Sequence, residues 1–257
     1  MRWLIEPDVF QGDAEPLMEA LDKLDIKYTR CKFGVPYEKY IEEEGREKTM
    51  FYGSLQFGKL LQKKSAFVKV FCNLPKLECL HYYPKFGDRL LNSGYLMLPF
   101  GDLQRKKKQL FSSGEECFFV RPSSGYKTFT GGIITHEEWD DRIHELERRI
   151  DPETLVVVSA PRRIIKEWRA VVVDGRVITG GQYKNEGSVV RINGLPPDVS
   201  EFAQQVVDSV KYNPDPAWVL DVCETEFVKK VLEVGSFSCS GLYACDCEAV
   251  VKAIEGL

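Results

Sequence analysis

The sequence predicts an α+β protein in which an N-terminal α/β region precedes a second region with a different order of elements. Three observations support this prediction. Strands and helices alternate over the first 72 residues, strands predominate from residue 115 onward, and no run of 18 apolar residues indicates a membrane span. We therefore expect two domains, one over residues 1–85 and one over residues 86–257, with the core of the second over residues 115–257.

In the N-terminal region, short apolar segments alternate with segments of helical periodicity. Strands are predicted at residues 2–5, 27–33, 49–53 and 66–72, and helices over residues 14–25 and 55–64. Strands that alternate with helices indicate a mostly parallel sheet. The segment EPDVFQGD after the first strand lacks the glycine pattern of a dinucleotide site, so none is predicted there.

Residues 84–114 are predicted to be a transition between the two regions, because they contain prolines and several glycines. The basic run at residues 105–109 lies within them. A solvated helix face or a linker is the favoured interpretation of this run, and a binding patch is the alternative.

The second region has its own order of elements. Strands are expected over ECFFVR and GGIIT, and Thr135 and Glu138 form a capping box before a helix. A buried strand over residues 154–160 follows, and then a hairpin over residues 167–184 that turns at Asp174-Gly175. The remaining predicted elements are a helix capped by Asp198, the strands 217–223 and 230–237, and a C-terminal helix.

Charge and cysteine content narrow the class of protein. A net charge of -4 argues against a general nucleic-acid binder, which is usually basic. The start of the chain is acidic and too short for a signal-peptide core, so a cytoplasmic location is expected. The eight cysteines are therefore expected to be reduced and buried. Zinc binding by Cys239, Cys245 and Cys247 is the weaker interpretation, because they form no C-x-x-C pair and no histidine lies nearby.

Charged residues stand on or beside apolar strands in the second region. One cation precedes a loop of small residues, SSGYKTFTGG, and another lies inside it. Buried charges are costly unless they are paired or bind a ligand. Internal salt bridges would explain each residue singly, but the set as a whole suggests an anionic ligand. Its members are Arg121, Lys127, Arg169, Lys184, Asp221 and Glu233.

Residues 115–257 resemble an ATP-grasp domain in the order and spacing of these residues. The resemblance implies that Arg121, Arg169 and Lys184 bind phosphate and that the loop with Lys127 covers the phosphates. It also implies an adenine hinge at VVVSAP, with Ser159 contacting the nucleotide, and a magnesium site at Asp221 and Glu233, which are twelve positions apart.

Arg121 stands where many members of the family have lysine. This feature resembles a divergent clade that includes the cell-division-cycle assembly factor of eukaryotic translation initiation and phage and bacterial proteins proposed to ligate peptides. The catalytic residues implied are Arg121 and Arg169. One position departs from the family: Gly235 replaces the asparagine of the common E-x-N motif, and Ser236 is the alternative ligand.

The resemblance implies an ATP-dependent carboxylate–amine ligase of the peptide type that works through an acylphosphate. The expected cofactors are ATP and Mg²⁺, and the expected partner is an amino acid, peptide or protein substrate, without a membrane or nucleic acid. One alternative is an ATP-binding assembly protein with little or no turnover. Another is an α/β interaction module whose strand charges form salt bridges. Arg162 and Arg163 are either surface charges or ligands for a substrate carboxylate.

Overall fold

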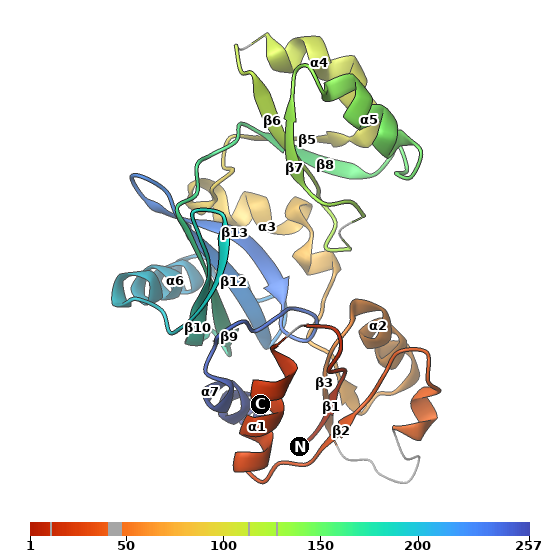
Figure 1. Cartoon of the computed structure of the whole chain (residues 1–257), viewed down its shortest axis with the longest axis vertical. Helices are drawn as coiled ribbons and strands as arrows, with labels where there is room; N and C mark the ends of the chain where they lie inside the picture. Colours follow the sequence, from red (N-terminus) through yellow and green to blue (C-terminus); the bar gives the residue numbers. More distant parts are fainter. Residues whose placement is uncertain (11, 41–47, 113, 127) are drawn as a thin grey trace. The chain divides into compact units, whose positions relative to one another are not determined.

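A computed structural model describes residues 1–10, 12–40, 48–112, 114–126 and 128–257 of the chain (Figure 1). The chain divides into two compact units. Unit 1 contains residues 1–73 and 164–257, and unit 2 contains residues 74–163. Unit 1 is thus assembled from both ends of the sequence, and unit 2 is a single continuous segment.

Unit 1 begins with the parallel sheet that the sequence predicts. Its strands have the order β2-β1-β3-β4 and all neighbours are parallel. The strands are β1 (Arg2–Ile5), β2 (Tyr28–Arg30), β3 (Thr49–Tyr52) and β4 (Val68–Lys69), and the helices between them are α1 (Ala14–Lys23) and α2 (Leu55–Lys64). β4 is shorter than predicted because the backbone of Phe71 bonds to Ser238 rather than to β3.

The second sheet of unit 1 is antiparallel with the order β11-β10-β9-β12-β13. Its strands are β9 (Lys166–Val173), β10 (Arg176–Asn185), β11 (Ser188–Asn193), β12 (Ala217–Glu224) and β13 (Lys229–Ser236), and its helices are α6 (Pro197–Val210) and α7 (Cys247–Glu255). The predicted turn at Asp174-Gly175 is confirmed, with both φ angles positive at 47° and 74°. The predicted cap at Asp198 is wrong. Proline at the first helical position starts α6, and Asp198 instead pairs with Lys229 at 2.6 Å.

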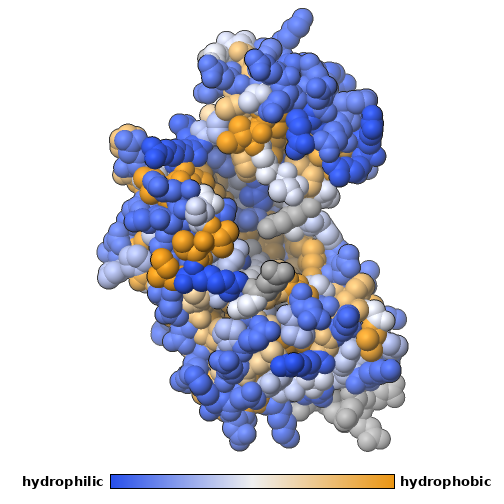
Figure 2. All heavy atoms as spheres, in the orientation of Figure 1, coloured by the Kyte–Doolittle hydropathy of each residue, from blue (hydrophilic) through white to orange (hydrophobic). Residues whose placement is uncertain are grey.

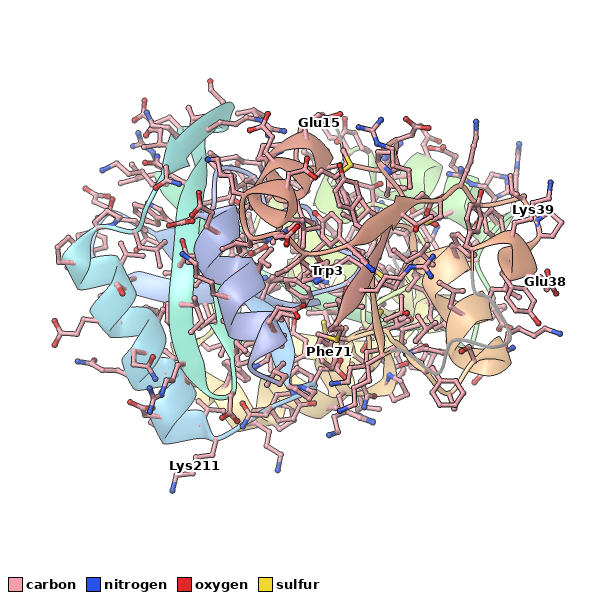
Figure 3. The ribbon with its side chains drawn as sticks, turned by 90° about the horizontal axis from the view of Figure 1, so that it is seen from below. Trp3, Glu15, Glu38, Lys39, Phe71 and Lys211 are labelled. Carbon is pink, nitrogen blue, oxygen red and sulfur yellow. The ribbon has the colours of Figure 1, made fainter. Side chains whose placement is uncertain are left out.

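One hydrophobic core serves both sheets of unit 1. Trp3 from β1, Phe71, Val171 from β9, Val219 from β12 and Val250 from α7 all belong to it. Figure 3 shows the side chains of Trp3 and Phe71 inside the unit. Residues 1–73 therefore share their core with residues 164–257. The domain boundary expected between residues 85 and 86 stays a prediction.

Among its described residues, unit 2 contains a four-stranded sheet of order β5-β8-β6-β7 and three α-helices, besides short 3-10 helices. The strands are β5 (Tyr95–Pro99), β6 (Cys117–Pro122), β7 (Gly132–Thr135) and β8 (Leu155–Ser159), and the helices are α3 (Cys79–Phe86), α4 (Leu103–Phe111) and α5 (Trp139–Glu147). One face of the sheet is buried against α4 and α5 in a core that includes Val120, Val156 and Val158 together with Trp139 and Ile143 of α5.

The segment 84–114 is more regular than the sequence suggested, since it contains β5, α4 and the end of α3. The basic run at residues 105–109 lies on α4, as the helix-face interpretation predicts. In Figure 2 the surface over α4 and α5, at the top of the view, is mostly hydrophilic. One bond of the predicted capping box forms, since Glu138 N donates to Thr135 Oγ1 at 3.2 Å, but the helix proper begins at Trp139 with Glu138 rather than Thr135 as its N-cap.

All eight cysteines are free thiols. Over the described ranges of the chain, no helix combines the length and the apolar character needed to cross a lipid bilayer.

Candidate functional site

A row of charged residues crosses three neighbouring strands of unit 1. Asp221 of β12 pairs in register with Arg169 of β9 on one side and with Glu233 of β13 on the other. Residues directly opposite each other in a sheet project from the same face, with Cβ atoms about 4.5–5.5 Å apart. The structure therefore brings together three of the residues that the sequence singled out.

Arg169 and Asp221 form a buried, bidentate ion pair. Arg169 Nε donates to Asp221 Oδ1 at 2.8 Å, and Arg169 Nη2 donates to Asp221 Oδ2 at 2.7 Å. Their side chains are only 10% and 5% exposed. Burial alone lowers the pKa of Arg169, but the charge and hydrogen bonds of Asp221 outweigh it, so the pKa is raised well above its ordinary value. The pair is thus electrically neutral inside the protein.

A second row lies beside the first on the same face, two residues further along β9 and β12 and three residues along β13, where the register shifts. Lys184 of β10 pairs in register with Glu167 of β9, and Lys184 Nζ lies 3.2 Å from Glu167 Oε1. Cys223 of β12 faces Glu167, and Lys230 of β13 faces Cys223. Glu167 is buried, whereas the side chain of Lys184 is 41% exposed. The predicted cation Lys184 therefore stays accessible beside the first row.

The location of this charged patch follows from the strand sequences. Because side chains alternate along a strand, Val171 and Val219 share a face with Arg169 and Asp221, and both valines enter the common core. Trp168 and Leu220 project from the opposite face, where both are buried. The same face of the sheet thus carries apolar side chains at Val171 and Val219 and charged side chains at Arg169 and Asp221.

Two tyrosines that the sequence did not single out complete the patch. The rings of Tyr183 and Tyr243 stack with centroids 4.7 Å apart, and the guanidinium carbon of Arg169 lies 4.8 Å from the centroid of Tyr243. Burial is the main cause that raises the pKa of both hydroxyls. A lone tyrosine in a loop gives no sequence signal for such a contact. Glu167 does give a sequence signal. Side chains alternate along the strand segment EWR, so Glu167 and Arg169 lie on the same face.

The substitution at Gly235 has a steric explanation. A Cβ atom at this position would lie 2.8 Å from Val219 Cγ2, so asparagine would require Val219 to move. Ser236 does not replace the missing side chain. It pairs with Trp218, faces away from Glu233, and accepts a hydrogen bond from Cys239 N at 3.3 Å.

Unit 2 holds the other predicted residues. Arg121 of β6 pairs in register with Val157 of β8, and Ser159 pairs with Phe119, so Arg121 and Ser159 share one face of the sheet. Ser159 is 3% exposed, and its hydroxyl has no hydrogen-bond partner among the residues that the structure describes. A buried hydroxyl without a partner is costly, which is consistent with a ligand contact at this position.

The small-residue loop returns close to Arg121. A Cβ atom at Gly131 would lie 2.8 Å from Arg121 Cβ, so only glycine permits this approach. Lys127 lies outside the described residues. Arg162 and Arg163 are both exposed after β8.

Unit 2 also contains a cavity of about 450 Å³ between the loop, β7 and α5. Its polar lining includes Thr128, Thr130, Arg142 and Arg149. Both arginines pair with Glu145, at 2.8 and 3.2 Å. Thr128 and Thr130 belong to the loop predicted to cover the phosphates, but among the described residues none of the individually predicted site residues lines the cavity.

The comparisons with known proteins agree on the fold. A family model described as the ATP-grasp domain, R2K clade family 3, matches residues 88–254. The D-cycloserine synthetase DcsG is similar in structure, with a TM-score of 0.70 and 13% sequence identity over 99% of this chain and 98% of that one.

Two further structures are similar over nearly their whole length. One is a RimK-domain ATP-grasp protein from Sphaerobacter thermophilus, with a TM-score of 0.64 and 13% identity over 97% of this chain and 98% of that one. The other is the D-alanine–D-alanine ligase from Bacillus anthracis, with a TM-score of 0.59 and 12% identity over 99% and 96%. No curated protein sequence matches this one. The predicted ATP-grasp fold is therefore confirmed, and the narrower relation to the translation-initiation assembly factor stays a prediction.

Proposed function

The chain belongs to the R2K clade of ATP-grasp domains, and on this basis we propose that it is an ATP-dependent ligase that joins a carboxylate to an amine. The similar structures include a D-alanine–D-alanine ligase and the ATP-grasp ligase PsnB in complex with a minimal precursor. An amino acid, peptide or protein substrate is the corresponding proposal for this chain.

ATP is the first substrate in this proposal. Its phosphates carry several negative charges, which Arg121, Lys127 and Lys184 neutralise and Arg169 helps to orient. The hydroxyl of Ser159 donates a hydrogen bond to the nucleotide. The hydroxyl without a partner at Ser159 and the close approach of Gly131 to Arg121 support a ligand in this part of unit 2.

Asp221 and Glu233 are proposed to hold Mg²⁺. Magnesium prefers one or two carboxylates together with phosphate oxygens and water. A carboxylate has about four lone-pair positions, so Asp221 retains acceptor capacity after its two bonds to Arg169. When bound, the metal would neutralise charge on the phosphate oxygens. The residues present therefore fit the ion.

The proposed chemistry has two steps. A carboxylate oxygen of the substrate attacks the γ-phosphorus of ATP, giving an acylphosphate and ADP. An amine nitrogen then attacks the acyl carbon, phosphate leaves, and the amine loses a proton. Positioning and charge neutralisation account for most of the catalysis of phosphoryl transfer, so no nucleophilic side chain is needed. The observation that carries the proposal is the row Arg169–Asp221–Glu233 on adjacent strands of one sheet.

A nucleotide-binding assembly protein with little or no turnover is the second candidate. Gly235 favours it, because the third side chain of the usual acidic motif is missing and Val219 occupies the space. Both oxygens of Asp221 are also already engaged by Arg169.

The test measures binding and turnover separately. Calorimetry with Mg–AMPPNP reports nucleotide binding, and ADP release from Mg–ATP is followed with a panel of amino acids and peptides. A ligase binds the analogue and releases ADP faster with one carboxylate and amine pair. Binding without stimulated ADP release identifies the assembly protein. Absence of binding refutes both candidates and leaves the strand charges as structural ion pairs.

A further inference from the structure

Tyr243 has a backbone conformation that aromatic residues rarely adopt. Its φ angle is +54°, in the left-handed region, where the side chain of an L-residue is crowded by its own backbone. Tyr243 lies in the loop that connects β13 to α7. A bulky residue in this region is an outlier that the surrounding structure must hold in place, and such outliers concentrate at functional sites.

The loop is fixed on both sides of Tyr243. Before it, a Cβ atom at Gly241 would lie 2.6 Å from Asp13 Oδ2, so the backbone approaches the buried Asp13 as closely as glycine allows. After it, Asn193 Nδ2 donates to Ala244 O at 2.7 Å, and Asp246 N donates to Thr179 Oγ1 at 3.2 Å. These contacts fix the backbone on both sides of residue 243 without using its side chain.

The side chain of Tyr243 closes over the guanidinium of Arg169. Its ring stacks on Tyr183 at an interplanar angle of 15°, and the guanidinium carbon lies 4.8 and 5.8 Å from the centroids of Tyr243 and Tyr183. Asp221 and the carbonyl oxygen of Gly241, at 2.7 Å from Arg169 Nη1, restrain the same group through hydrogen bonds. Arg169 is thus restrained by hydrogen bonds and by contact with an aromatic ring.

This arrangement leaves part of the guanidinium for a ligand. An arginine side chain has five N–H groups, and within the described residues three of those in Arg169 have acceptors. An aromatic face attracts the cation without competing for these donors as a carboxylate would. A glycine or asparagine at position 243 would fit the backbone better but would not supply the ring.

We propose that Tyr243 is a positioning residue that holds Arg169 so that its two remaining N–H groups meet a phosphate oxygen of the bound nucleotide. The inference rests on the proposed function for the identity of the ligand. The restraint of Arg169 by the ring does not depend on it.

The experiment uses the full chain and measures two quantities for each variant, the melting temperature and the affinity for Mg–AMPPNP. Tyr243→Gly relieves the backbone strain and removes the ring, so the melting temperature is expected to hold or rise while the affinity for Mg–AMPPNP falls about tenfold. Tyr243→Asn, which also tolerates the left-handed region, is the second variant. Tyr243→Phe keeps the ring and is expected to bind within about twofold of the wild type.

Lys211 supplies the matched control. It also has a positive φ, +51°, at the end of α6, and its side chain points outward (Figure 3). Lys211→Gly should raise the melting temperature as well and leave the affinity for Mg–AMPPNP unchanged. Equal affinities in the glycine variants at positions 243 and 211 would overturn the proposal.

A ligand-independent measurement separates this inference from the proposed function. Hydrogen exchange of the Arg169 Nε–H group, followed by NMR of ¹⁵N-labelled protein, should be faster in Tyr243→Gly and unchanged in Lys211→Gly. Unchanged exchange in Tyr243→Gly refutes the restraint, whatever the nucleotide does. A wild type that does not bind Mg–AMPPNP refutes the proposed function and the phosphate contact, and the exchange rates still decide whether Tyr243 restrains Arg169.

Discussion

The Arg169–Asp221 pair of unit 1 and the Ser159 hydroxyl of unit 2 are both buried, but only the pair has its hydrogen bonds made by described residues. In unit 1, Arg169 and Asp221 meet each other through two hydrogen bonds and are neutral as a pair. In unit 2, the buried hydroxyl of Ser159 has no acceptor or donor among the described residues. The comparison teaches that the Arg169–Asp221 pair is satisfied within the folded protein, whereas Ser159 is suited to a ligand. Breaking that pair should mainly affect stability, and substitutions in unit 2 should mainly affect binding.

The largest expected effect is on the stability of unit 1. Asp221→Ala would leave Arg169 as a buried charge without its partner, and the free energy of unfolding should fall by about 3–5 kcal/mol. Chemical denaturation measures this loss. Glu224→Ala is the control: it breaks the more exposed pair with Lys166, and it should cost less than about 1 kcal/mol. Equal losses in the two variants would show that the row is not a structural pair.

Glu233→Gln tests whether the row also has a ligand. Glu233 lies opposite Asp221, and two neighbouring carboxylates disfavour each other's charge unless a cation lies between them. The stability without ligand should therefore hold or rise. Mg–nucleotide at about 100 times its dissociation constant should stabilise the wild type by about 2.7 kcal/mol and the variant by much less. Thermal melts with and without Mg–AMPPNP check this, and an equal shift in both proteins would contradict the metal assignment.

Arg121→Ala should affect binding more than stability. Loss of a charge-assisted bond to phosphate is worth about 1.5–3 kcal/mol, and about 1.4 kcal/mol is one decade in affinity. Calorimetry with Mg–AMPPNP should therefore show affinity reduced about tenfold or more. Arg105→Ala, on the exposed face of α4, is the matched arginine control and should bind as the wild type does. A lower melting temperature with unchanged affinity would show that Arg121 has a structural role, like the Arg169–Asp221 pair, and does not bind phosphate.

The smallest effect is expected from a pair of serines. Ser159→Ala removes a buried hydroxyl that lacks a partner, so stability should not fall, while nucleotide affinity should fall by about two- to tenfold. Ser54→Ala removes the hydroxyl that caps α2 by accepting from Phe57 N, and it should cost about 1 kcal/mol of stability. Denaturation and calorimetry on both variants complete the comparison. A loss of stability in Ser159→Ala without a loss of affinity would count against its contact with the nucleotide.

Several elements were predictable because their signals are local. The apolar residues on either side of Asp221 and Glu233 placed both acids on strands, and the alternation of strands and helices predicted the parallel sheet. The segment 84–114 was not predictable in the same way. Pro84 suggested a break, but it lies inside α3, where the buried Tyr82, Tyr83 and Phe86 stabilise the helix by packing.

The sequence by itself determined which residues lie on strands, which way they face along each strand, and that the set resembles an ATP-grasp domain. Periodicity and turn chemistry act over a few residues, so they can be read from the chain. Only the tertiary structure decided that Arg169 neutralises Asp221, which lies 52 positions away, and that Tyr243 covers Arg169 from a left-handed backbone conformation. Likewise, only the fold showed that residues 1–73 and 164–257 share one core. Such partners are set by the register between distant strands and by packing across them, and no short stretch of sequence contains that information.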